Sequence, residues 1–294
     1  MALRRVYAVV LLAGCLCACQ SQPVQTGTSL HPWEEDRAYM QDLEQHGVVE
    51  AGRHTVAWFP SNTLDPAQIA AIVARLDHGI GAAKQYIGKP QWAFRGDSRV
   101  YFYFPDARFV SHAPGGNTVL IPWWRIRDDQ APWLHEALHL LLAPAGGDWL
   151  ATPGNIAAAR MPLWLHEGLA ESLAMDIAAE EGLVHYSPLI DVPAARLDAL
   201  CKSRLRHASS DRVLASIGGR GKLPELFGPN RVSYALPFYT CSTSFVRHLG
   251  TRYGKGPLLR AIGAFDQEIE VLQQDMARSL AEVKEDWLKE VTAI

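Results

Sequence analysis

The sequence predicts an α+β fold, with strands and one long helix in its first half and helices through the rest. Three short runs are rich in aromatic and β-branched residues, as is typical of strands: Val48–Phe59, Arg99–Phe104 and Thr118–Pro122. Apolar residues recur at helical spacing from Pro66 to Ile87, behind the turn-and-cap stretch Pro60–Asp65. The same spacing predicts further helices at His31–Gln45, Trp133–Leu142, Met161–Ala179, Val192–Arg206, Leu236–Tyr253, Lys255–Ala264 and Met276–Val291.

Length and composition are those of an ordinary globular protein. The chain has 294 residues, of which 48% are hydrophobic and 20% charged, with a formal net charge of −3. That is enough for one large domain or two small ones. There is no basic excess, so we expect no nucleic-acid partner. The sequence has no internal repeat or long linker, so we expect one domain over residues 33–294, with an α/β lobe to about 143 and a helical lobe from about 160.

The N-terminus predicts export and a lipid anchor. Arg4 and Arg5 precede an apolar run that is too short to span a bilayer comfortably. The run ends in Leu-Ala-Gly-Cys15, which resembles a bacterial lipobox, so residues 1–14 are expected to be a signal peptide and Cys15 the lipidated residue. Cys19 is a poorer candidate, and a plain secretory signal is the alternative. Residues 15–32 are polar and turn-rich and predict a flexible tether to the envelope membrane, on the periplasmic face of the outer membrane in a Gram-negative cell.

A metal site is indicated by His135, Glu136 and His139, which form the pattern H-E-x-x-H inside an apolar helix. Residues four apart on a helix project from nearly the same face, so the two imidazoles can converge on one ion. Glu136 lies at the flank of that face, where a carboxylate could take a proton from the attacking water. This division of labour is typical of zinc-assisted hydrolysis.

A second cluster supplies the third ligand that tetrahedral zinc requires. Glu167 follows His139 after 27 intervening residues, and Glu171 lies one helical turn further on. His166 faces another side of the same helix, where a supporting or structural role is expected. The alternatives are chance occurrence of H-E-x-x-H in a chain with eleven histidines, or a histidine pair that is merely packed in the helix. Buried imidazoles need partners, and the second cluster provides them.

The two motifs together, H-E-x-x-H and W-L-H-E-G-L-A-E, resemble those of the gluzincin branch of zinc metallopeptidases (peptidase MA-like proteins). The resemblance covers roughly residues 98–260. It implies a thermolysin-like catalytic fold, in which a small mixed sheet precedes the H-E-x-x-H helix and a helical lobe follows. It also implies one Zn²⁺ ion held by His135, His139 and Glu167, with Glu136 as general base. Glu171 matches an acid that orients the first zinc-bound histidine.

Two further expectations rest on this resemblance. The strand before the zinc helix is the sheet edge that pairs with extended substrate in these enzymes, which assigns that role to Asn117–Ile121. Related proteins often show a tyrosine six residues before a Phe-Val pair, and Tyr239 has that spacing from Phe245 and Val246. Tyr239 is therefore expected to stabilise the oxyanion. Tyr234 is the other candidate, and simple packing of Tyr239 is the alternative.

The expected function is a membrane-anchored zinc peptidase that acts on peptides or proteins. Zinc aminopeptidases hold the substrate's amino terminus with an acidic G-x-M-E-N-type strand, whereas this chain has Pro114–Asn117 in that region without a glutamate. An endopeptidase is therefore favoured. The alternatives are an envelope lipoprotein with a non-catalytic zinc that acts as a binding or scaffold module, and hydrolysis of a cell-wall peptide or other amide. The sequence leaves the oligomeric state open.

The remaining cysteines predict a disulfide. Cys201 and Cys241 are the only two outside the N-terminal cluster, and an exported chain meets oxidising conditions. The alternative is two buried free thiols.

Overall fold

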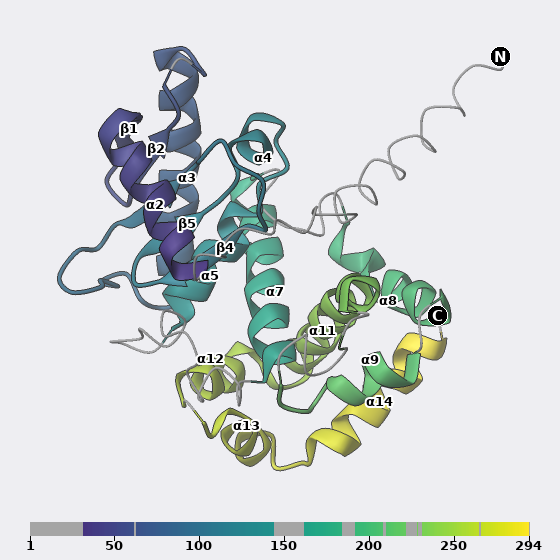
Figure 1. Cartoon of the computed structure of the whole chain (residues 1–294). Coiled ribbons are helices and arrows are strands. Elements are labelled where there is room, and N and C mark those ends of the chain that lie inside the picture. The colour runs from purple at the N-terminus through teal and green to yellow at the C-terminus, as the bar shows by residue number, and fades with distance from the viewer. Residues whose placement is uncertain are drawn as a thin grey trace, which may run out of the picture. The chain divides into compact units, whose positions relative to one another are not determined.

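The first half of the described chain, in purple to teal in Figure 1, contains helices and all the strands of the described residues. The strands form one mixed sheet of five. The computed structural model describes residues 32–61, 63–143, 162–183, 192–207, 210–221, 228, 231–264 and 266–293. The strands are β1 (Val48–Ala51), β2 (Thr55–Phe59), β3 (Val100–Tyr103), β4 (His112–Gly115) and β5 (Thr118–Leu120). They lie in the order β1-β2-β3-β5-β4, with the two inner pairs parallel and the two outer pairs antiparallel. The predicted α+β class is confirmed.

The first strand region is a hairpin and not the single strand predicted over Val48–Phe59. The chain reverses between β1 and β2, where the amide of Gly52 donates to the carbonyl of Thr55 at 2.9 Å. Asp77 Oδ1 accepts from the Thr55 amide at 3.0 Å and ties the turn to the helix behind it. Sequence alternation could not reveal the turn, because apolar residues continue on both sides of it.

Helices cover both faces of the sheet, which follows from the alternation of side chains along each strand. One face carries Phe59, Phe102 and Val119, which belong to the main core beneath α3 (Pro66–Tyr86) and α5 (Trp133–Leu142). The other face carries Tyr103 and Leu120, which form a smaller cluster with residues of α2 (Pro32–His46). The sheet is therefore a layer between α2 and the α3–α5 pair.

Local sequence explains where α3 begins. Asp65 accepts from the Gln68 amide at 2.9 Å, and the Gln68 side chain accepts in return from the Asp65 amide at 3.2 Å. This capping box, with Pro66 at the first helical position, satisfies amides that a helix start leaves free. A short helix that the sequence analysis did not predict, α4 (Trp123–Arg127), leads from β5 into α5.

The second half is helical. Its elements are α7 (Leu163–Glu181), the 3₁₀ turn η1 (Ala194–Arg196), α8 (Leu197–His207), α9 (Ser210–Ser216), α11 (Arg231–Tyr253), α12 (Lys255–Gly263), α13 (Glu268–Met276) and α14 (Leu280–Ala293). α7 packs closely on α11, because Gly168 lets the two backbones approach: a Cβ there would lie 2.7 Å from the carbonyl oxygen of Ser242.

Three helix starts differ from the prediction by several residues. The helix predicted at Val192–Arg206 begins at Leu197, after the turn η1. α11 begins at Arg231 and not at Leu236, because the helix accommodates Pro237 in its interior. The helix predicted at Met276–Val291 begins at Leu280, and Met276 instead ends α13. Ala277 separates the two helices in a left-handed conformation, with φ of 52°.

A disulfide joins α8 to α11, since the sulfurs of Cys201 and Cys241 lie 2.02 Å apart. Residues 32–294 form one compact unit. The predicted signal peptide, the lipidated Cys15 or Cys19, and all of the tether except Pro32 lie outside the described residues. Within the described part of the chain, no helix is long and apolar enough to cross a bilayer.

Candidate metal centre

The centre is built where α5 meets α7, and α5 carries three of its residues. His135 and His139 project from one face, as their spacing of four requires, and their rings meet edge to face with centroids 4.8 Å apart. Glu136 is buried beside them. Leu134, Leu138 and their apolar neighbours anchor the other faces of α5 in the core, so the helix holds the two imidazoles in place.

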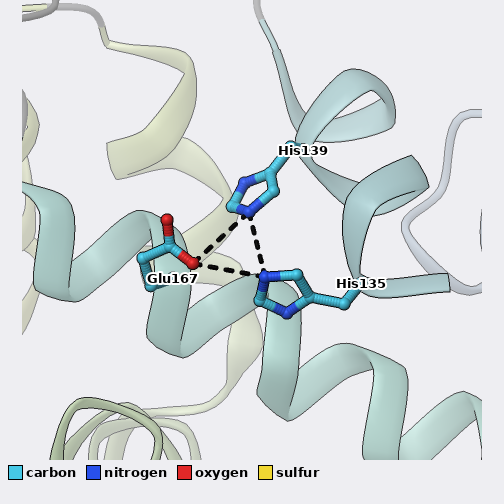
Figure 2. A group of neighbouring side chains, drawn as sticks. All are labelled: His135, His139 and Glu167. Atoms are coloured by element: carbon cyan, nitrogen blue, oxygen red, sulfur yellow. Dashed lines mark hydrogen bonds and ion pairs between the residues drawn. The ribbon is translucent and has the colours of Figure 1, made fainter. Parts of the chain in front are cut away.

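Glu167 on α7 completes a triangle of possible ligands (Figure 2). His135 Nε2 lies 3.2 Å from His139 Nε2 and 3.2 Å from Glu167 Oε2, and the third side, from His139 Nε2 to Glu167 Oε2, is 3.5 Å. In a tetrahedral zinc site with bonds of about 2.0–2.1 Å, ligand atoms lie about 3.3–3.4 Å apart. Two imidazole nitrogens and a carboxylate oxygen at these separations fit a zinc ion.

Glu171 sets the orientation of His135. Its Oε2 lies 3.0 Å from His135 Nδ1, one turn along α7 from Glu167. A carboxylate only accepts hydrogen bonds, so a proton belongs on Nδ1, and the neutral ring would present the lone pair of Nε2 to the triangle. The Glu171 side chain is 3% exposed, whereas those of His139 and Glu167 are 13% and 17% exposed, so what solvent exposure the triangle has is on their side.

Burial and neighbouring charges shift the pKa values of the residues in this centre in different directions. Burial alone would lower the pKa of His135, but the bonds and charges of Glu167 and Glu171 raise it well above its ordinary value. Burial likewise opposes ionisation of Glu167, but His139 and His135 hold its pKa well below the usual range. Glu136 differs, because its burial raises its pKa more than the neighbouring histidines lower it. The carboxylates of this site would attract a divalent cation.

Tyr239 of α11 lies close enough to the site for the charges of Glu167 and Glu136 to act on its hydroxyl. Burial raises the pKa of its hydroxyl well above the ordinary value, and the charges of Glu167 and Glu136 raise it further. The hydroxyl therefore keeps its proton and can serve as a hydrogen-bond donor.

The prediction that Asn117–Ile121 is the sheet edge that pairs with substrate was wrong. β5 lies between β3 and β4, so Asn117–Ile121 is an inner segment and β4 is the free edge on this side of the sheet. The reason is the turn at Gly115 and Gly116, whose φ values of 124° and 66° allow the chain to fold back on itself. The residues up to Gly115 form the added strand β4, which was not among the predicted strands.

His112 on β4 is a neighbour of the centre that the sequence analysis did not single out. Its Nε2 lies 3.1 Å from Asp36 Oδ2, and its Nδ1 lies 2.8 Å from the Val110 carbonyl. Burial lowers the pKa of His112, but these two bonds and the charges of Asp36 and Glu136 raise it above the ordinary value overall. No motif surrounds His112, and Asp36 is distant in sequence, so no pattern could have revealed the pair.

Comparison with known proteins finds only weak structural similarity. No protein-family model and no curated protein matches the sequence. Among solved structures, the chain is similar to an M1 zinc metallopeptidase from Deinococcus radiodurans, with 13% identity and a TM-score of 0.42. A mutant of an M1 zinc metallopeptidase from that organism, bound to a Tyr-Ser-Ala substrate, gives 13% and 0.43. Both likenesses cover 82% of this chain, which spans about half the length of those proteins (50%).

Proposed function

We propose that this protein is a zinc-dependent peptidase with a gluzincin-type centre. The observation that carries the proposal is the triangle of His135, His139 and Glu167, with a buried carboxylate, Glu136, directly beside it. Two nitrogens and one oxygen leave the fourth tetrahedral position for water or substrate, as catalytic zinc sites do.

The roles of the protein groups follow from their positions. A zinc ion held by the triangle would supply Lewis acidity toward a carbonyl and acidify a water molecule. Glu136 accepts the proton of the attacking water and delivers it to the nitrogen of the leaving amine. The burial of Glu136 favours its role as a general base and acid. Burial raises its pKa toward neutral pH, where a carboxyl group both takes up and releases protons more readily than at its ordinary pKa.

An extended peptide is the substrate that the sheet favours. β4 is an edge strand, so its outer backbone groups can pair with a peptide that lies along it. Tyr239 approaches from α11 and donates its hydroxyl to the oxyanion that forms when the carbonyl is attacked. β4 carries no acidic residue that would hold a substrate amino terminus, so we propose an endopeptidase.

A structural zinc in a scaffold protein is the competing function. Structural sites are usually closed by a fourth protein ligand. Within the described ranges, the group that could hold a metal comprises His135, His139 and Glu167 and no fourth side chain. Three ligands favour catalysis over a structural role.

We also propose that the protein is anchored to the envelope through a lipid on Cys15. The support is the Leu-Ala-Gly-Cys15 pattern after a short apolar run. Mass spectrometry of the N-terminal peptide of membrane-extracted protein should find a diacylated cysteine at position 15. An unmodified Cys15, or a lipid on Cys19, would contradict this assignment.

The test of the peptidase is metal analysis of purified residues 32–294 combined with cleavage of a peptide library. We expect one zinc per chain, internal cleavage of peptides, loss of activity after chelation and its return with added zinc. A protein that binds one zinc but cleaves no peptide would instead support the scaffold function.

A further inference from the structure

The start of α7, which carries Glu167, is held by contacts from the C-terminal part of the chain. The N-cap residue, Pro162, offers no side-chain hydrogen bond to the first turn. Instead, the indole of Trp164 donates to the carbonyl of Gly219 at 3.0 Å, and Pro162 forms a parallel bridge with Gly221. The segment 219–221 therefore runs along the first turn of α7 and supports it.

Arg220 lies in the middle of that segment and connects it to α13. Its guanidinium lies 3.1 Å from Glu268 Oε2 and 2.9 Å from Glu270 Oε2. The two carboxylates differ in their surroundings, because the Glu268 side chain is 1% exposed and that of Glu270 is 64% exposed. The other oxygen of Glu268 lies 3.8 Å from Nε2 of His166, which is also buried.

This buried carboxylate has a physical consequence for the metal centre. A carboxylate out of water is costly unless it is paired, so Glu268 is bound by Arg220. It packs against His166 at 3.8 Å, a distance too long for a hydrogen bond. Successive residues on a helix point about 100° apart, so the side chain of His166 turns toward α13 while that of Glu167 turns toward α5. Packing of Glu268 against His166 therefore restricts how the first turn of α7 can rotate, and with it the direction of Glu167.

We propose that Glu268 and Arg220 are positioning residues for the metal centre, acting through His166 on the ligand Glu167. This inference rests on the proposed zinc site. Functional groups of such centres must be held to within about 0.5 Å, and Glu167 lies close to the start of α7, where no capping side chain orders the first turn. We call Arg220, Glu268 and His166 the α7 clamp.

Zinc affinity tests the clamp, with Glu268→Gln and Glu270→Gln as a matched pair. Each substitution removes one carboxylate from the same arginine, but only Glu268 reaches His166. We expect Glu268→Gln to weaken zinc binding about 10-fold, as measured by competition with a chelator. Glu270→Gln should stay within about 2-fold of wild type, since exposed ion pairs contribute little. The absorption spectrum of the Co²⁺-substituted protein should change for Glu268→Gln alone, because it reports ligand geometry.

The outcomes separate the clamp from the zinc site. Equal zinc affinity and equal Co²⁺ spectra in the two variants would overturn the clamp, while zinc binding by wild type would still stand. A wild-type protein without bound zinc would overturn the site and the clamp together. Glu268→Asp provides the same comparison if Glu268→Gln does not fold, because it keeps the charge beside Arg220 and shortens the reach toward His166. Unchanged zinc affinity in a folded Glu268→Asp would then overturn the clamp.

Discussion

At the scale of single residues, the proposed chemistry depends on side chains that are one hydrogen bond away from the triangle. Glu171 is the clearest of these, because it contacts His135 on the nitrogen that faces away from the other ligands. It is almost completely buried, with 3% of its side chain exposed. The strength of metal binding should therefore depend on a residue that is not itself a ligand.

Glu171→Gln should reduce zinc affinity by about 10–100-fold, because an amide is a weaker acceptor and orients His135 less firmly. Competition with a chelator measures this. Glu180→Gln is the matched control, since Glu180 is an exposed carboxylate on the same helix. Equal affinities for the two variants would show that Glu171 does not support the site.

Tyr239→Phe should lower turnover by about 10²–10³-fold while zinc content and melting temperature stay at their wild-type values. The substitution keeps the ring and removes only the hydroxyl, so it distinguishes donation from packing. Tyr234→Phe, on the same helix, should leave turnover nearly unchanged. If Tyr234→Phe lowered turnover and Tyr239→Phe did not, Tyr234 would be the residue that donates to the oxyanion.

At the scale of elements, the centre depends on α7, which packs against α5 on one side and α11 on another. Gly168 makes the second contact possible, because a side chain at this position would meet the Ser242 carbonyl. Glu167, the proposed metal ligand, immediately precedes it. The same turn of α7 thus serves the close helix packing and the metal centre.

Gly168→Ala should destabilise the protein by about 1–3 kcal/mol, because the added methyl group forces α7 and α11 apart. Gly250→Ala in α11 is the control: its nearest neighbour would lie 3.6 Å away, so alanine should be neutral or stabilising by helix propensity. Urea denaturation of both variants measures the difference. Equal midpoints would contradict the close packing inferred here.

The sequence predicted the long helices of this fold and the strands β3 and β5, and it missed several other short elements. α3 and α7 were predicted to within a few residues, because each has helical spacing over many turns. β4 and α4 were missed, since four or five residues cannot establish a period. The β1–β2 turn was missed because apolar residues continue through it.

The candidate site was predictable where local spacing encodes it. His135 and His139 are four apart on one helix, so their convergence follows from helix geometry, and Figure 2 shows them with Glu167. The pairing of His112 with Asp36, and of His166 with Glu268, depends on how distant elements pack. No sequence pattern carries that information, so these neighbours appear only in the folded chain.

At the scale of the whole molecule, zinc should link the two halves of the chain. α5 belongs to the first half and α7 to the second, and each supplies ligands. Zinc that binds only the folded state stabilises it by about 2.7 kcal/mol when its free concentration is 100 times the dissociation constant. Chelation should therefore lower the melting temperature of wild type and leave His139→Ala unaffected. Equal shifts in both proteins would show that the stabilisation does not come from this site.

The most direct test of the central claim is the zinc content and peptide turnover of Glu136→Gln. The amide keeps the shape of the side chain but cannot accept the proton of the attacking water. We predict one zinc per chain, as in wild type, and turnover reduced by about 10²–10⁴-fold or to background. A Glu136→Gln protein that holds zinc and cleaves peptides at the wild-type rate would contradict the proposed mechanism.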